Sequence, residues 1–185
     1  DVFVSVAGGA SSYLALLIAA RTLSTADNAL FLTFWSLLFW SFGIISGLQS
    51  ETTRAVRSAR TGLTEVGPLD PSPREGARVV PLALGVGAAV ALLASVTAPW
   101  WGERLLGTSW VMPVAVLAVA VTAFAGHNAV AGALAGRGSW NGYARLVGAE
   151  AGVRVVAFTI VGVLGVGLLG LQAVAGVAAF TWLLL

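Results

Sequence analysis

Cysteine and lysine are both absent from the 185 residues, and only 10% of the residues are charged. Without cysteine the chain has no disulfide framework, no thiolate metal site and no cysteine nucleophile. Soluble domains are usually about 25% charged, because their surfaces are hydrated. The scarcity of charge, together with a mean hydropathy of +0.91, therefore excludes a soluble globular domain. It also excludes low-complexity disorder, which requires low hydrophobicity and high net charge.

What the sequence does contain is long apolar runs, with 58% hydrophobic residues overall. A membrane helix needs roughly 20 mainly apolar residues, and barrel strands would alternate with a period of two. The runs do not alternate, so we predict an all-α polytopic membrane protein. Its six transmembrane helices, forming one bundle, are expected at about 2–20, 30–49, 79–98, 110–135, 143–166 and 168–185.

The two ends of the sequence suggest that the chain is part of a longer protein. It begins with Asp1 and is still apolar at Leu185. The first run lacks the basic start of a signal peptide, so we expect it to be a retained helix. Residues 61–76 include Pro68, Pro71 and Pro73. These residues predict a cytoplasmic loop between the second and third expected spans, because this proline spacing opposes a helix.

The distribution of arginine predicts the orientation in the membrane. Cytoplasmic loops are enriched in Lys and Arg, and two arginines, Arg21 and Arg104, fall on one side of the expected bundle. Seven fall on the other side: Arg54, Arg57, Arg60, Arg74, Arg78, Arg137 and Arg145. We therefore expect a multi-pass protein of the bacterial cytoplasmic membrane with a cytoplasmic N-terminus and lipids as its solvent. The net charge of +2 is too small to indicate a basic surface for binding nucleic acid, so no nucleic-acid partner is predicted.

Glu150 and Arg154 are the sharpest local feature, because both lie inside the fifth apolar run. Residues four apart share one face of a helix and can form an ion pair. A central charge costs roughly 2.5–3.5 kcal/mol on insertion scales, so neither residue is expected to face lipid. The pair has two readings of about equal weight: a structural lock between helices, or a site that handles a substrate or an ion.

His127 and Asn128, inside the fourth run, are candidates for a polar cavity. A histidine is able to relay protons. With no carboxylate in the same span, hydrogen-bonded packing is the favoured role. Arg21 and Arg54 lie at opposite span ends, where each could reach a phosphate or could serve as a topology anchor.

Small residues form a stripe on one face of the fourth run: Ala125, Ala129, Gly132 and Gly136. Such a stripe permits close helix approach. The sequence contains no G-x-S-x-G, H-E-x-x-H or P-loop motif, so we predict no enzymatic activity, no bound metal and no cofactor.

Two segments carry a more specific signal. Residues 20–31 read Ala-Arg-Thr-Leu-Ser-Thr-Ala-Asp-Asn-Ala-Leu-Phe, and residues 132–145 read Gly-Ala-Leu-Ala-Gly-Arg-Gly-Ser-Trp-Asn-Gly-Tyr-Ala-Arg. The first resembles the turn between the first two helices of polysaccharide flippases of the multidrug/oligosaccharidyl-lipid/polysaccharide exporter superfamily, although Asn28 and Ala29 stand where that family usually has an aromatic residue and glycine. The second resembles the family's glycine-rich turn between helices four and five. Glu150 and Arg154 fall where its fifth helix often carries an acidic and a basic residue.

The resemblance implies that the chain is the N-terminal lobe of a transporter with two six-helix lobes. Such flippases move a polyprenyl-pyrophosphate-linked oligosaccharide by alternating access, and they act in polysaccharide or cell-envelope biosynthesis. The expected substrate-binding residues are then Arg21, Arg54, Glu150 and Arg154, and the expected partners are the lipid-linked glycan and a C-terminal lobe. Two alternatives remain open: a cation-coupled drug or metabolite exporter of the same superfamily, and a membrane scaffold subunit that transports nothing.

Overall fold

The fold, a computed structural model, is described for residues 2–61 and 74–184, with side chains for residues 8–58 and 79–184. The described residues form α-helices and one 3₁₀ helix. In chain order the elements are α1 (Val2–Thr22), α2 (Thr25–Thr61), α3 (Arg74–Leu106), α4 (Val111–Gly136), α5 (Trp140–Leu164), α6 (Gly167–Val177) and the 3₁₀ helix η1 (Ala178–Leu184).

Five described stretches are long and apolar enough to cross a membrane: Thr25–Ser58, Val79–Leu106, Val111–Gly136, Trp140–Leu164 and Gly167–Leu184. The predicted class, a helical membrane-embedded protein, is therefore confirmed. The remaining expected span coincides with α1, a helix of 21 residues. Large apolar side chains cover the outside of the bundle, as lipid-facing positions require; Leu82, Leu93 and Val163 are 70%, 66% and 82% exposed.

The helices extend beyond several of the expected spans. α2 continues to Thr61 and α3 begins at Arg74, so both ends of the predicted 61–76 loop are helical and residues 62–73 lie outside the described part. α3 also continues through Pro81 and Pro99. The last apolar run is not one α-helix, because η1 follows α6. Hydropathy locates the apolar part of a helix, whereas polar ends continue the same backbone hydrogen bonds beyond it.

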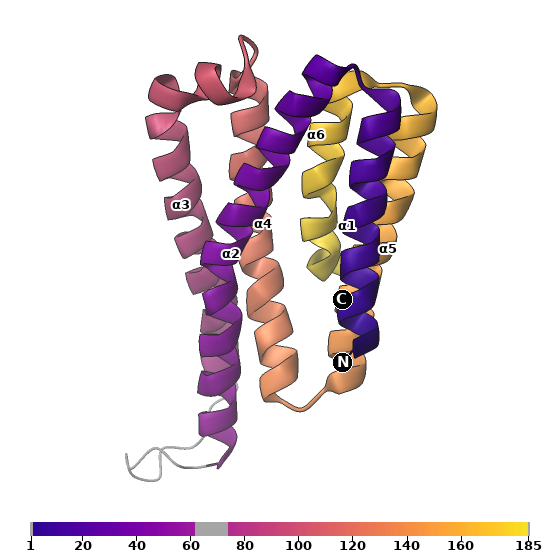
Figure 1. The fold of residues 1–185 in the computed structure, drawn as a ribbon. Coiled ribbons are helices and arrows are strands. Elements are labelled where there is room, and N and C mark those ends of the chain that lie inside the picture. The colour runs from indigo at the N-terminus through magenta and orange to yellow at the C-terminus, as the bar shows by residue number, and fades with distance from the viewer. Residues whose placement is uncertain (1, 62–73, 185) are drawn as a thin grey trace.

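Successive helices run in opposite directions along the bundle (Figure 1). Short turns make this possible. Ser24 begins α2 as a capping residue, because its Oγ accepts the backbone N–H of Asp27 at 3.2 Å and donates to the Asp27 carboxylate at 2.8 Å. α5 ends at Leu164 and is capped by Gly165, whose left-handed φ of 63° suits glycine and lets its N–H turn back to carbonyls of the last turn.

Helix α4 lies at the centre of the bundle. It packs against α2 and α3 and also contacts α5, α6 and η1, while α1 packs chiefly along α5. The core between these helices contains buried Phe31, Phe34 and Leu38 of α2, Val121 of α4 and Phe158 of α5.

The small-residue stripe on α4 lies against neighbouring helices, as predicted. A Cβ added to Gly132 would lie 2.6 Å from the backbone oxygen of Gln49, and one added to Gly136 would lie 2.8 Å from Cβ of Val56. Ala125 similarly approaches Gly87 of α3. Only the absence of larger side chains allows α2 and α4 to come this close.

Candidate functional site

Glu150 and Arg154 form the predicted ion pair on one face of α5. Arg154 Nη2 donates to Glu150 Oε1, and the two side chains are only 7% and 13% exposed, respectively. Gly152, the midpoint of the 25-residue helix, lies between them. Glu150 therefore lies just before the middle of α5 and Arg154 just beyond it. A pair buried this far from both helix ends avoids the cost of a lone charge.

Helix α1 supplies a further partner to Arg154. Arg154 Nη1 donates to Ser11 Oγ at 3.3 Å, and Ser11 in turn donates to the carbonyl oxygen of Gly8 at 2.8 Å. On the other side, the guanidinium lies 5.9 Å from the ring centroid of Phe39, a cation–π distance. Arg154 Nε is buried and has no hydrogen-bond partner. One donor of the guanidinium thus remains available to a ligand or to water.

His127 contacts the same carboxylate from α4. Its Nε2 lies 3.5 Å from Glu150 Oε2, so the acidic partner that its own span lacks comes from α5. The Nδ1 of His127 and the Nδ2 of the adjacent Asn128 are both buried without a hydrogen-bond partner. His127 therefore belongs to the same cluster as the ion pair, and the buried Asn128 is the next residue along α4. We call Ser11, His127, Asn128, Glu150 and Arg154 the polar cluster.

A row of aromatic rings lies beside the polar cluster and contacts it at Arg154 and His127. Along α2, Phe31, Trp35, Phe39 and Phe42 follow one another at centroid distances of 5.7, 4.7 and 5.8 Å. The row continues onto α4 through Phe124, 3.8 Å from Phe42, to the ring of His127, 5.7 Å further on.

Phe158 of α5 meets the row edge-on, with its centroid 5.8 Å from that of Trp35. Apolar rings exclude water and lower the local dielectric, which strengthens the charge interactions beside them.

The aromatic row and Ser11 are the part of the site that the sequence alone did not predict. Aromatics at positions 31, 35, 39 and 42 have helical spacing, and that spacing was the available signal. It predicts only a shared face, and does not reveal that the face lies beside a charge. Ser11 carried no signal, because a single serine in an apolar helix is common.

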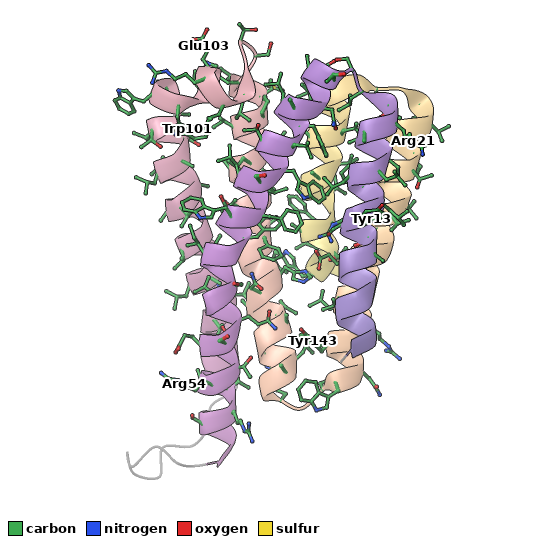
Figure 2. The ribbon with its side chains drawn as sticks, in the orientation of Figure 1. Tyr13, Arg21, Arg54, Trp101, Glu103 and Tyr143 are labelled. Atoms are coloured by element: carbon green, nitrogen blue, oxygen red, sulfur yellow. The ribbon has the colours of Figure 1, made fainter. Side chains whose placement is uncertain are left out.

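Arg21 and Arg54 are not part of the polar cluster. Figure 2 shows Arg21 near one end of the bundle and Arg54 near the other. Both are exposed, and Arg54 Nη2 lies 3.1 Å from Glu51 Oε2 in a surface ion pair. The structure thus separates the four predicted substrate-binding residues into one buried pair and two peripheral arginines.

Within the described ranges, no group of three or more His, Cys, Asp or Glu side chains is placed to hold a metal ion. The polar cluster provides instead one carboxylate between two cationic or protonatable groups, with unpartnered nitrogens beside it. Such a site has the chemistry to accept an anion at Arg154, or to exchange a proton between Glu150 and His127.

Comparison with known proteins gives relatives but no family. The chain is 32% identical over 175 residues to the uncharacterized protein Rv1510 of Mycobacterium tuberculosis, covering 94% of this chain. It is 32% identical over 177 residues both to the uncharacterized protein Rv3630 of the same organism and to the uncharacterized protein Mb3654 of Mycobacterium bovis. The chain spans only 38–39% of the length of these curated relatives. No protein-family model and no solved structure matches it.

Proposed function

We propose that this chain is the N-terminal six-helix lobe of a flippase that moves a polyprenyl-pyrophosphate-linked oligosaccharide across the cytoplasmic membrane by alternating access. The observation that carries the proposal is the buried Glu150–Arg154 pair near the middle of α5, in a bundle whose helices are apolar enough to span a membrane. Ionisable residues at membrane depth are costly and commonly mark substrate or ion pathways.

The polar cluster suits the anionic part of such a substrate. A pyrophosphate needs cationic and N–H donors when it leaves water. Arg154 Nε and Asn128 Nδ2 are buried and unpartnered, and Glu150 holds the guanidinium in place through Nη2. Arg154 would therefore bind the anion, and Glu150 would orient Arg154. Arg21 and Arg54, at the two ends of the bundle, would contact the head group before and after it crosses.

The extent of the relatives is compatible with a two-lobe protein. The chain matches 38–39% of their length, so more than half of each relative lies outside the matched region. A second lobe of similar size is part of the proposal. The bundle end with Arg54, Arg57, Arg137 and Arg145 would face the cytoplasm, as would the N-terminus.

One contact favours a second candidate function, a cation-coupled exporter of the same superfamily. His127 and Glu150 lie 3.5 Å apart, and a buried imidazole–carboxylate pair is a chemically suitable site for proton exchange. An exporter of this type would use the pair to couple proton entry to the release of a drug or metabolite.

Transport by the full-length protein in liposomes tests the proposal. The probe is a fluorescent polyprenyl-pyrophosphate oligosaccharide, whose arrival in the outer leaflet is detected by an impermeant quencher. We expect the wild type to move the probe, and Arg154→Ala to lose movement while reaching the membrane in normal amount. Arg154→Lys should retain part of the probe movement, because lysine keeps the positive charge but lacks the planar set of N–H donors of the guanidinium.

The outcomes separate the alternatives. Normal movement by Arg154→Ala would contradict a binding role for the pair. If the wild type does not move the glycan but exports a drug in exchange for entering protons, the protein is the cation-coupled exporter and not the flippase. A wild type that moves neither compound would favour the scaffold subunit.

A further inference from the structure

A second polar site lies at the opposite end of the molecule from Arg54. Here the beginning of α2, the α3–α4 turn with the first residues of α4, and the beginning of α6 line a cavity of about 520 Å³. In Figure 2 this is the end of the bundle near the labels of Arg21 and Glu103. The cavity is separate from the polar cluster, since none of the five cluster residues lines it.

Three helices begin at the cavity. Asp27 lies in the first turn of α2, Met112 in that of α4 and Leu168 in that of α6, and all three line it. The N-terminus of a helix carries partial positive charge and unpaired N–H groups. Ser24 caps α2, but neither α4 nor α6 has a side-chain cap. Acceptor oxygens of a ligand would therefore be stabilised here.

A buried side chain points independently to a ligand. Gln172 lines the cavity, is only 1% exposed, and its Nε2 has no hydrogen-bond partner. It lies one turn beyond Leu168 on α6, four residues along the same helix face. An amide N–H₂ buried without a partner costs free energy, and an acceptor oxygen bound in the cavity would supply the missing bond.

The rest of the lining defines the chemical class of the ligand. Thr108 and Ser109 contribute hydroxyls, and Asp27 contributes a carboxylate, which accepts hydrogen bonds from hydroxyl groups. The same carboxylate disfavours a phosphate by charge repulsion. Leucine side chains make up much of the remaining wall: Leu30, Leu106, Leu168 and Leu169. The lining therefore combines donors and acceptors for an uncharged polyol with an apolar surface.

The aromatic residues nearby place the cavity at the membrane surface. Trp100 is 72% exposed near the end of α3, and the half-buried Trp110 precedes α4. Exposed tryptophans at helix ends favour the level of the lipid headgroups. A molecule bound at this depth is embedded by its tail and hydrated at its head.

We propose that this cavity binds the uncharged sugar headgroup of a glycolipid, with Gln172 donating to a sugar oxygen and Asp27 accepting from a sugar hydroxyl. The apolar wall holds the first carbons of the lipid tail. The site requires that this end of the bundle lies at the membrane surface, but it does not rest on the proposed transport function, since a glycolipid bound here is able to act as a fixed structural lipid.

The test is native mass spectrometry of the full-length protein released from phosphatidylcholine nanodiscs. Equal amounts of a glucosyl diacylglycerol and of phosphatidylglycerol are added as competing probes. We expect the wild type to retain the glucosyl lipid in preference to phosphatidylglycerol. Gln172→Leu should weaken that retention by about fivefold to tenfold, the effect of one lost hydrogen bond.

Two further variants keep the test decisive. Leu169→Trp fills the cavity from a side chain that is 45% exposed, so it should block binding without disturbing the core. Gln49→Leu is the matched control, because it makes the same substitution on α2, at a residue that contacts Tyr143 and does not line the cavity. It should leave retention unchanged.

The proposal is overturned if Gln172→Leu and Leu169→Trp both retain the glucosyl lipid as the wild type does, or if phosphatidylglycerol is preferred. Glycan transport is measured separately on the same variants. Loss of lipid retention with normal transport, or the reverse, then distinguishes this site from the polar cluster.

Discussion

The imidazole of His127, on α4, lies 3.5 Å from the carboxylate of Glu150, on α5. The same carboxylate accepts a hydrogen bond from Arg154, which also reaches Ser11 on α1. Glu150 therefore links three helices through one negative charge. Its removal would leave a buried guanidinium without a counter-ion and an imidazole without its neighbouring carboxylate.

Glu150→Gln should lower the stability of the full-length protein by about 3 kcal/mol, because breaking a buried ion pair on one side leaves the other charge uncompensated. The double variant Glu150→Gln with Arg154→Met should be more stable than that single variant, since it removes both charges. The free energy of unfolding in detergent micelles is the measurement. The single variant Arg154→Met completes the comparison. If the double variant loses as much free energy of unfolding as the two single variants added together, the two side chains are not coupled.

Gly132→Ala should destabilise the bundle by about 1–3 kcal/mol, the range for overpacking a closely packed interface. The added methyl would lie 2.6 Å from the backbone oxygen of Gln49, and backbone cannot easily move away. Gly148→Ala is the control, because a Cβ at Gly148 meets no atom within 4 Å. Gly148→Ala should be neutral or slightly stabilising, because alanine is favoured over glycine inside a helix when there is space for its methyl group. Equal thermal unfolding of both variants would contradict the close approach of α2 and α4.

Phe158→Ala should lower the free energy of unfolding by about 2 kcal/mol, because the smaller side chain leaves a cavity in the bundle. In a membrane the hydrophobic driving force between helices is absent, so the lost packing accounts for the effect. Phe158 is fully buried and meets Phe31 and Trp35 edge-on. Trp40→Ala is matched to it, since Trp40 is a large aromatic residue that is 70% exposed. Thermal unfolding should show a clear shift for the first variant and little for the second. A larger shift in thermal unfolding for Trp40→Ala than for Phe158→Ala would contradict the packing of Phe158 against the aromatic row.

Single cysteines should report the orientation of the bundle, because the chain has none of its own. In a cysteine-free form of the full-length protein, Thr108→Cys in the α3–α4 turn should react with an impermeant maleimide added outside intact cells. Ser139→Cys, in the α4–α5 turn, should react only after the cells are opened. Both positions are exposed, so access depends on the side of the membrane. If Ser139→Cys reacted in intact cells and Thr108→Cys only in opened cells, the orientation in the membrane would be the reverse of the proposed one.

Two properties followed from residues that are close in the sequence. The apolar runs predicted a helical membrane-embedded protein, because the length of such a run directly measures whether a helix can cross the hydrocarbon. The pairing of Glu150 with Arg154 was equally local, since a spacing of four residues places both on one helix face. The ends of α2 and α3 were predicted less well, because their polar ends extend helices whose apolar parts alone are visible in hydropathy.

The polar cluster as a whole was decided by the tertiary structure. Ser11 and Arg154 are 143 positions apart in the chain, and no local pattern selects this serine from the others. The sequence also assigned His127 a packing role because its own span holds no carboxylate, whereas the packing of α4 against α5 supplies one.

The sequence by itself determined that this chain is helical and embedded in a membrane, and that one ion pair lies within a helix, because these depend on composition and on spacing along one backbone. The tertiary structure decided which helices meet and what they enclose. It placed the aromatic row beside Arg154, separated Arg21 and Arg54 from it, and formed the cavity at Gln172. Each of these depends on contacts between helices, and such contacts are set by the packing of whole helix faces, which spacing within a single helix does not specify.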